Sequence, residues 1–122
     1  MEKEFVNVYC YQIDVKLKED NYVDINIKRS VEISIDEGHF YQPYEMINGI
    51  IQKKALWIPK GELDNLRNGH NMFFSLRDNY TDSEIITKYL RYINYEVEKY
   101  ETRFNQAKTV QKALEKKVHN ND

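Results

Sequence analysis

The 122-residue chain has few of the residues on which several classes of protein depend. None of its four glycines falls in a GxGxxG or GxxxxGK[ST] pattern, so no phosphate-binding loop is predicted. A single cysteine, Cys10, permits neither an intramolecular disulfide nor a cysteine zinc site. There is no apolar run of the roughly 18 residues needed to span a membrane, and no secretory signal at the start. We therefore expect a cytoplasmic protein with no membrane partner.

The charge is nearly balanced. Lysine and arginine number 18 against 20 acidic residues, which leaves a formal charge of -2. Such a chain has no overall positive field, so nucleic acid is not an expected partner, and local arginines must hold any anionic ligand. The length fits one domain, and we predict a single domain over residues 1–122.

Alternating polar and apolar residues predict an N-terminal sheet region over residues 1–79. The alternation is clear over 5–17, where Cys10 should be packed, and over 23–36, where the strand is either continuous or broken near Ser30. Shorter strands are expected at 55–58 and 72–77, with a helical turn at 63–66 that ends at Asn68-Gly69. Pro43 and Gly49 argue against one regular element in 40–52, which is left unassigned. No connection is long enough for a helical crossover, so the sheet should be antiparallel.

A long helix is predicted over residues 80–119, and the fold class is therefore α+β. Thr81 and Glu84 have the spacing of a capping box at its start. Beyond them, apolar residues recur at spacings of four and three and form a heptad stripe, here called the seam. The seam residues are Ile86, Leu90, Ile93, Val97, Tyr100, Phe104, Ala107, Gln111, Leu114 and Val118.

This helix is too long for its own sheet to cover. At 1.5 Å per residue it extends about 54 Å, whereas a domain of this size has a radius of gyration of about 14 Å. The seam must therefore meet the seam of another copy, or the helix must break near Asn105 and fold back. We favour the first alternative and expect a homo-oligomer. Gln111 is either a polar residue that sets the register or a single tolerated polar position.

No catalytic grouping is found in the sequence. Ser/His/Asp, Cys/His and HExxH patterns are absent, and His39, His70 and His119 are far apart. Asp36, Glu37 and His39 supply at most half of a metal site. We expect no enzyme activity, no metal and no cofactor.

Aromatic residues and arginines suggest a binding site instead. The chain has ten tyrosines, and rigid aromatic rings are common at interfaces and under planar ligands. Arginines bind phosphates and rings stack on bases. Trp57 and one of Phe73 and Phe74 should be in the core, and the other phenylalanine should face the helix or a partner. The candidate ligand-binding residues are Arg29, Trp57, Phe73, Phe74, Arg77, Asn94 and Arg103.

Two positions among these candidates stand out in the pattern. Arg29 falls in the apolar series of its strand, so it should pair with an acid or face a ligand. Asn94 and Arg103 adjoin seam residues, which favours a pocket shared between protomers.

An antiparallel sheet followed by a long pairing helix, in a short tyrosine-rich chain, resembles the Thoeris anti-defence sponges of bacteriophages. The resemblance covers nearly the whole chain. It rests on the segment 71–77 (NMFFSLR) and the helix segment 101–104 (ETRF), which look like the family's positions for a stacking aromatic residue and a ligand-holding arginine.

The resemblance implies a function. Proteins of that family sequester cyclic ADP-ribose isomers, such as glycocyclic ADP-ribose, without cleaving them, and so block Thoeris immunity. Some members also bind cyclic oligonucleotides as higher oligomers, so a dimer or a larger assembly up to a hexamer is expected here. Two alternatives stay open: an oligomer that inhibits a host defence protein by direct contact, and a structural assembly factor.

Overall fold

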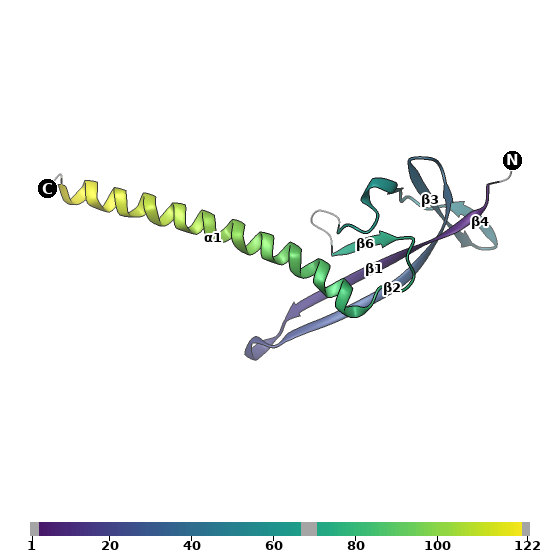
Figure 1. Ribbon diagram of the computed structural model, residues 1–122, viewed down its shortest axis with the longest axis horizontal. Coiled ribbons are helices and arrows are strands. Elements are labelled where there is room, and N and C mark those ends of the chain that lie inside the picture. The colour runs from purple at the N-terminus through teal and green to yellow at the C-terminus, as the bar shows by residue number, and fades with distance from the viewer. Residues whose placement is uncertain (1–2, 67–70, 121–122) are drawn as a thin grey trace. The chain divides into compact units, whose positions relative to one another are not determined.

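The computed structural model describes residues 3–66 and 71–120. The chain divides into two compact units, Met1–Tyr89 and Leu90–Asp122. The first unit holds the sheet and the start of the helix α1 (Asp82–Asn120), and the second holds the rest of that helix. An antiparallel sheet followed by one long helix confirms the predicted α+β class (Figure 1). The single domain over residues 1–122 stays a prediction.

The sheet is built from antiparallel neighbours in the order β4-β3-β2-β1-β6, with β5 paired to β3. Its strands are β1 (Phe5–Leu17), β2 (Val23–Asp36), β3 (Phe40–Ile47), β4 (Ile50–Lys53), β5 (Ile58–Pro59) and β6 (Met72–Ser75). The two longest strands pair along their whole length, from Phe5 opposite Ile35 to Leu17 opposite Val23. β2 runs without a break through Ser30, so of the two alternatives the continuous strand is correct.

The unassigned segment 40–52 is a β-hairpin. β3 and β4 pair up to Ile47 opposite Ile50, and the two residues between them are Asn48 at φ 51° and Gly49 at φ 79°. Two successive residues with positive φ make the tight turn that matches the twist of antiparallel strands, and Asn-Gly is its commonest sequence. The argument from Gly49 against a regular element was therefore wrong, since that glycine makes the turn.

Two shorter predictions also need correction. The strand expected at 55–58 begins only at Ile58, as β5. The helical turn expected at 63–66 lies earlier in the chain, as a short 3₁₀ helix at Lys60–Glu62. Asn68 and Gly69, the expected end of that turn, lie outside the described residues.

Both faces of the sheet carry a core. One cluster of buried residues contains Val8, Cys10, Tyr41, Ile58 and Phe74, so the predicted packing of Cys10 is confirmed. The cluster on the other face contains Tyr11, Ile13, Phe73 and Ile85, the last of which comes from the start of α1. Successive residues of a strand point to opposite faces, which explains how β1 contributes to both clusters.

The start of α1 is the capping box that the sequence predicted. The Glu84 amide donates to Thr81 Oγ1 at 3.2 Å, and the Thr81 amide donates to Glu84 Oε1 at 3.1 Å. The helix continues through Asn105 without a break. The alternative in which it folds back is therefore wrong. No helix within the described residues is both long enough and apolar enough to cross a membrane.

Candidate functional site

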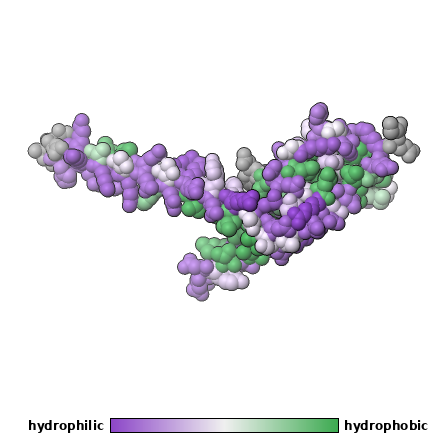
Figure 2. All heavy atoms as spheres, in the orientation of Figure 1, coloured by the Kyte–Doolittle hydropathy of each residue, from purple (hydrophilic) through white to green (hydrophobic). Residues whose placement is uncertain are grey.

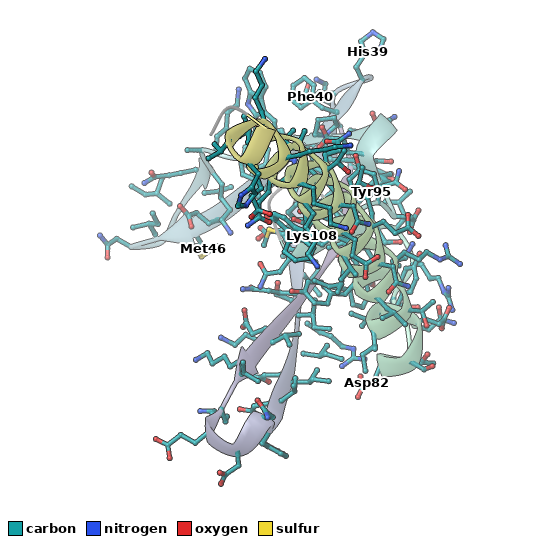
Figure 3. The ribbon with its side chains drawn as sticks, turned by 90° about the vertical axis from the view of Figure 1, so that its left-hand side faces the viewer. His39, Phe40, Met46, Asp82, Tyr95 and Lys108 are labelled. Atoms are coloured by element: carbon teal, nitrogen blue, oxygen red, sulfur yellow. The ribbon has the colours of Figure 1, made fainter. Side chains whose placement is uncertain are left out.

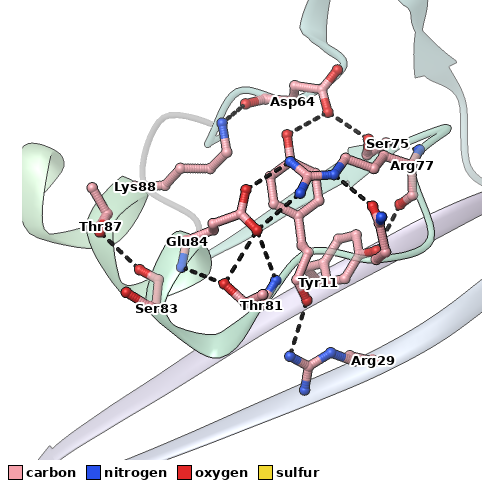
Figure 4. A network of polar contacts seen from close by, with 12 residues as sticks. Tyr11, Arg29, Asp64, Ser75, Arg77, Thr81, Ser83, Glu84, Thr87 and Lys88 are labelled. Atoms are coloured by element: carbon pink, nitrogen blue, oxygen red, sulfur yellow. Dashed lines mark hydrogen bonds and ion pairs between the residues drawn. The ribbon is translucent and has the colours of Figure 1, made fainter.

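Arg29 and Arg77, two of the candidate residues, are brought together at the start of α1 (Figure 4). The guanidinium of Arg29 forms an ion pair with Asp82 and donates to the Tyr80 carbonyl at 3.2 Å. The prediction that Arg29 pairs with an acid is confirmed. Arg29 thus connects β2 to the first residue of the helix.

Arg77 is held by three neighbours. Its guanidinium lies 2.7 Å from the Glu84 carboxylate, donates to Asn79 Oδ1 at 2.6 Å, and stands 4.3 Å from the centre of the Tyr80 ring. The hydrogen bond from Arg77, followed by that from the Thr81 amide, lowers the pKa of Glu84 below its ordinary value. Glu84 therefore stays ionised, and its negative charge interacts favourably with the positive N-terminal end of the helix dipole.

A second set of polar contacts lies beside Arg77. The Tyr80 hydroxyl donates to Asp64 Oδ1 at 2.7 Å, and the Lys88 ammonium donates to the Asp64 carbonyl at 2.5 Å. The Ser75 hydroxyl also donates to the Asp64 carboxylate. Burial, and then the hydrogen bond to Asp64, raises the pKa of Tyr80. Among the described residues no buried side-chain nitrogen or oxygen lacks a hydrogen-bond partner. This network attaches the helix to the sheet and leaves Arg29 and Arg77 engaged with acids.

Phe73 and Phe74 both belong to the core. They are 1% and 4% exposed, and they face the two different clusters, as adjacent strand residues must. The Phe73 ring stacks on Tyr11 with centroids 5.1 Å apart. Phe73 packs with Ile85 of α1, so the expectation that one of the two rings would face the helix is confirmed. Both rings are buried, and neither presents a ring face at the surface of the protomer.

Trp57 was expected in the core, and this was wrong. It is 67% exposed, and its ring lies against Phe40 with centroids 5.4 Å apart. It immediately precedes β5, whose first residue, Ile58, is buried instead. Trp57 therefore contributes an aromatic surface far in sequence from the arginines at the start of α1.

A small hollow adjoins Arg29. It has a volume of about 100 Å³ and is lined by Tyr9, Tyr11, Arg29, Ser30, Val31 and Asp78. Sites for small organic ligands occupy roughly 300 to 1,000 Å³. This hollow is too small for a nucleotide.

A larger hollow lies on the second unit, along α1. It is shallow and open to solvent, and it is lined by Tyr95, Glu98, Lys99, Thr102 and Arg103. Tyr95 is 64% exposed on the helix surface (Figure 3). Asn94 and Arg103 are both exposed helix residues, and only Arg103 lines the hollow.

Sequence reasoning had identified Arg103 here but had missed Tyr95 and Lys99. The signal was present in the spacing, because residues four apart lie on one side of a helix, and 95, 99 and 103 follow that spacing. Within the described residues, no three His, Cys, Asp or Glu side chains come together in a way that could hold a metal ion.

Comparison with known proteins identified no relative. No family model, no curated protein and no solved structure matches the chain.

Proposed function

We propose that this chain is a homo-oligomeric binding protein that sequesters a cyclic ADP-ribose-type nucleotide unchanged, and so blocks Thoeris immunity. The observation that carries the proposal is an α1 surface with an exposed apolar seam on one side and, on the other, an open hollow lined by a tyrosine, two cations and one acid. The seam supports the assembly, and the hollow supports an anionic aromatic ligand.

The seam favours assembly because its large side chains are exposed along the helix. Val97, Tyr100, Phe104, Leu114 and Val118 are between 47% and 62% exposed. Hydrophobic side chains are visible along the helix in Figure 2. Burying such a row against a second helix removes apolar area from water, at about 25 cal/mol per Å².

The side chains around the hollow on α1 suit a nucleotide. Arg103 and Lys99 supply positive charge for phosphates, and the exposed ring of Tyr95 supplies a surface on which adenine can stack. The family resemblance implied a stacking role for Phe73 or Phe74. Because both are buried, Tyr95 takes that role in this proposal.

The same residues favour binding over chemical conversion. The one aliphatic hydroxyl that lines the hollow, that of Thr102, donates to the Glu98 carbonyl at 3.0 Å. A nucleophile would need a base within hydrogen-bond reach, and Thr102 instead follows the common pattern of a helix threonine bonded to its own backbone. The nucleotide would therefore be held and released intact.

The test uses the product of an activated TIR enzyme. The protein is incubated with that product, separated by filtration and heat-denatured, and the released nucleotide is identified by mass spectrometry. Wild type should deplete the messenger and release it unchanged. Arg103→Ala should lose roughly 1.5 to 3 kcal/mol of charge-assisted hydrogen bonding, or about ten- to a hundredfold in affinity.

Tyr95→Ala should weaken binding by roughly 1 to 3 kcal/mol through lost stacking. Arg91→Ala is the matched control, since it removes an exposed arginine from the same helix but outside the hollow. No depletion by wild type would refute the proposal, and recovery of degraded nucleotide would show an enzyme.

A second candidate function is the inhibition of a defence protein by direct contact. It is favoured by the end of the β3–β4 hairpin, where Met46, Ile47, Ile50 and Ile51 are between 42% and 68% exposed. Exposed apolar groups gathered at one place are typical of protein-binding surfaces. Met46→Ser with Ile51→Ser should then abolish protection of phage in cells while leaving nucleotide depletion intact. Retained protection would exclude this candidate.

A further inference from the structure

We propose that two copies pair through α1 in antiparallel orientation, with Phe104 of one copy packed against the partner's Ala107. This inference rests on the proposed oligomeric function and adds the direction and register of the helices. The charge pattern that flanks the exposed seam carries it.

The seam defines a heptad in which Val97, Phe104 and Gln111 take position a, while Tyr100 and Ala107 take position d. Charges at the flanking positions e and g lie at the edges of the interface and select the orientation of the partner helix. The charged residues at position e are Glu101, Lys108 and Glu115, and those at position g are Glu96, Arg103 and Lys117.

The placement of Lys108 agrees with this assignment. Its ammonium lies 4.8 Å from the centre of the Phe104 ring, so the side chain extends along the edge of the seam (Figure 3 labels Lys108). Ile86, by contrast, is partly buried against the core cluster of the sheet unit. The part of the seam that needs a partner therefore begins beyond Ile86.

A parallel pair in register would bring like charges together. In that orientation each g residue faces the e residue five positions further along the partner. Glu96 would meet the partner's Glu101, and Arg103 would meet the partner's Lys108. Two-fold symmetry repeats each of these contacts, so the parallel arrangement is disfavoured at both edges.

In an antiparallel pair, residues of opposite charge meet instead. Position e then faces e, and position g faces g. In the register centred between Asn105 and Gln106, Glu101 meets the partner's Lys108, and Glu96 meets the partner's Lys117. Two-fold symmetry again repeats each contact. The charges therefore favour the antiparallel orientation on both edges.

The seam residues also fit in this register. The largest, Phe104, meets the partner's Ala107, so a large side chain fills the space beside a small one. Tyr100 meets the partner's Gln111, where a phenol and an amide can form a hydrogen bond. Val97 meets the partner's Leu114, and Ile93 meets the partner's Val118. Gln111 thus gains a polar partner inside an apolar seam.

The orientation is tested by disulfide formation in the full chain, with Cys10→Ala as the background. Val97→Cys and Leu114→Cys are made singly and together. In the antiparallel register only the double variant forms a disulfide-linked dimer under mild oxidation, because residue 97 meets residue 114. In a parallel dimer each single variant would cross-link to itself.

The charges are tested by measuring dimer dissociation in sedimentation experiments at low salt. Glu101→Lys and Lys108→Glu should each weaken the dimer about tenfold, and the double variant should restore it. In a parallel dimer both single variants would instead tighten association. Neither change harms the helix, because the lysine introduced at position 101 lies near Glu98, and the glutamate introduced at position 108 lies near Lys112.

The outcomes separate this inference from the function on which it rests. A monomer at micromolar concentration would refute both. A dimer that cross-links through the single-cysteine variants would refute the antiparallel orientation alone. So would a dimer in which the double-cysteine variant fails to cross-link and the charge changes have no effect.

Discussion

Phe73 and Phe104 show how differently the two units use the same residue type. Phe73 is 1% exposed and stacks on Tyr11 within the sheet unit. Phe104 is 60% exposed on the helix, where its ring contacts Lys108 of the next turn. One aromatic ring is already in a core, and the other is available to a second copy. An apolar residue in a clear periodic pattern is therefore not always buried by its own chain.

The polar contacts of the two units also differ, in the sequence distance between the residues that they join. In the sheet unit they join distant segments, as Arg29 does with Asp82 and Tyr80 does with Asp64. In the helix beyond Tyr89 the threonine hydroxyls donate to carbonyls four residues earlier, as Thr109 does to Asn105 at 3.1 Å. Contacts between distant segments hold the sheet unit together, whereas the helix makes bonds that any isolated helix can make.

The largest expected effect is on folding stability, from a substitution in the core of the sheet unit. Phe73→Ala should lower the free energy of unfolding by about 3 to 5 kcal/mol, because it leaves a cavity beside Tyr11 and Ile13. Phe104→Ala should change the stability of the sheet by less than about 0.5 kcal/mol, since that ring is exposed. Urea denaturation followed by near-ultraviolet circular dichroism of the tyrosines measures both. Equal losses would contradict the distinction between the two rings.

A smaller effect is expected when the seam is charged. Val97→Glu with Leu114→Glu should weaken self-association more than about a hundredfold, because the interface would have to bury unpaired carboxylates. Light scattering should then give the single-chain mass of 14.7 kDa. Thr109→Glu with Lys116→Glu is the control, as it adds charge to the same helix away from the seam. Loss of assembly in the control would show that added charge, not the seam, decides the result.

The smallest effect concerns pH. The bond from Arg77 lowers the folded-state pKa of Glu84, so the stability that this carboxylate contributes is present above its ordinary pKa of 4.5 and is lost as the pH falls through the folded value. Carboxyl-carbon NMR titration should find the pKa of Glu84 higher in Arg77→Gln than in wild type. Arg91→Gln should leave it unchanged. An unaltered titration in Arg77→Gln would mean that the ion pair does not form.

Much of the secondary structure could be predicted from local pattern. The alternation in β1 and β2 and the capping box at Thr81 each depend on residues a few positions apart, and each is confirmed. The β3–β4 hairpin was equally readable, since Asn48-Gly49 is a strong turn signal. Pro43 and Gly49 together favour a broken segment, and this obscures the turn signal.

The candidate site was less accessible to such reasoning. Pattern alone placed Phe73 and Phe74 on opposite faces, but it could not show that both faces of the sheet are covered. Nor could it show that Trp57 would be exposed while its neighbour Ile58 is buried. These outcomes depend on which segments, far apart in sequence, come to lie over each strand.

By itself, the sequence determined the long antiparallel hairpin of β1 and β2, the start of α1 and the heptad seam along it, because each follows from the geometry of a single strand or helix. Only the tertiary structure decided that Arg29 pairs with Asp82, that Arg77 pairs with Glu84, and that Phe73 and Phe74 are both buried. These contacts form only when the sheet and the start of the helix pack against each other. Local sequence pattern cannot predict that packing.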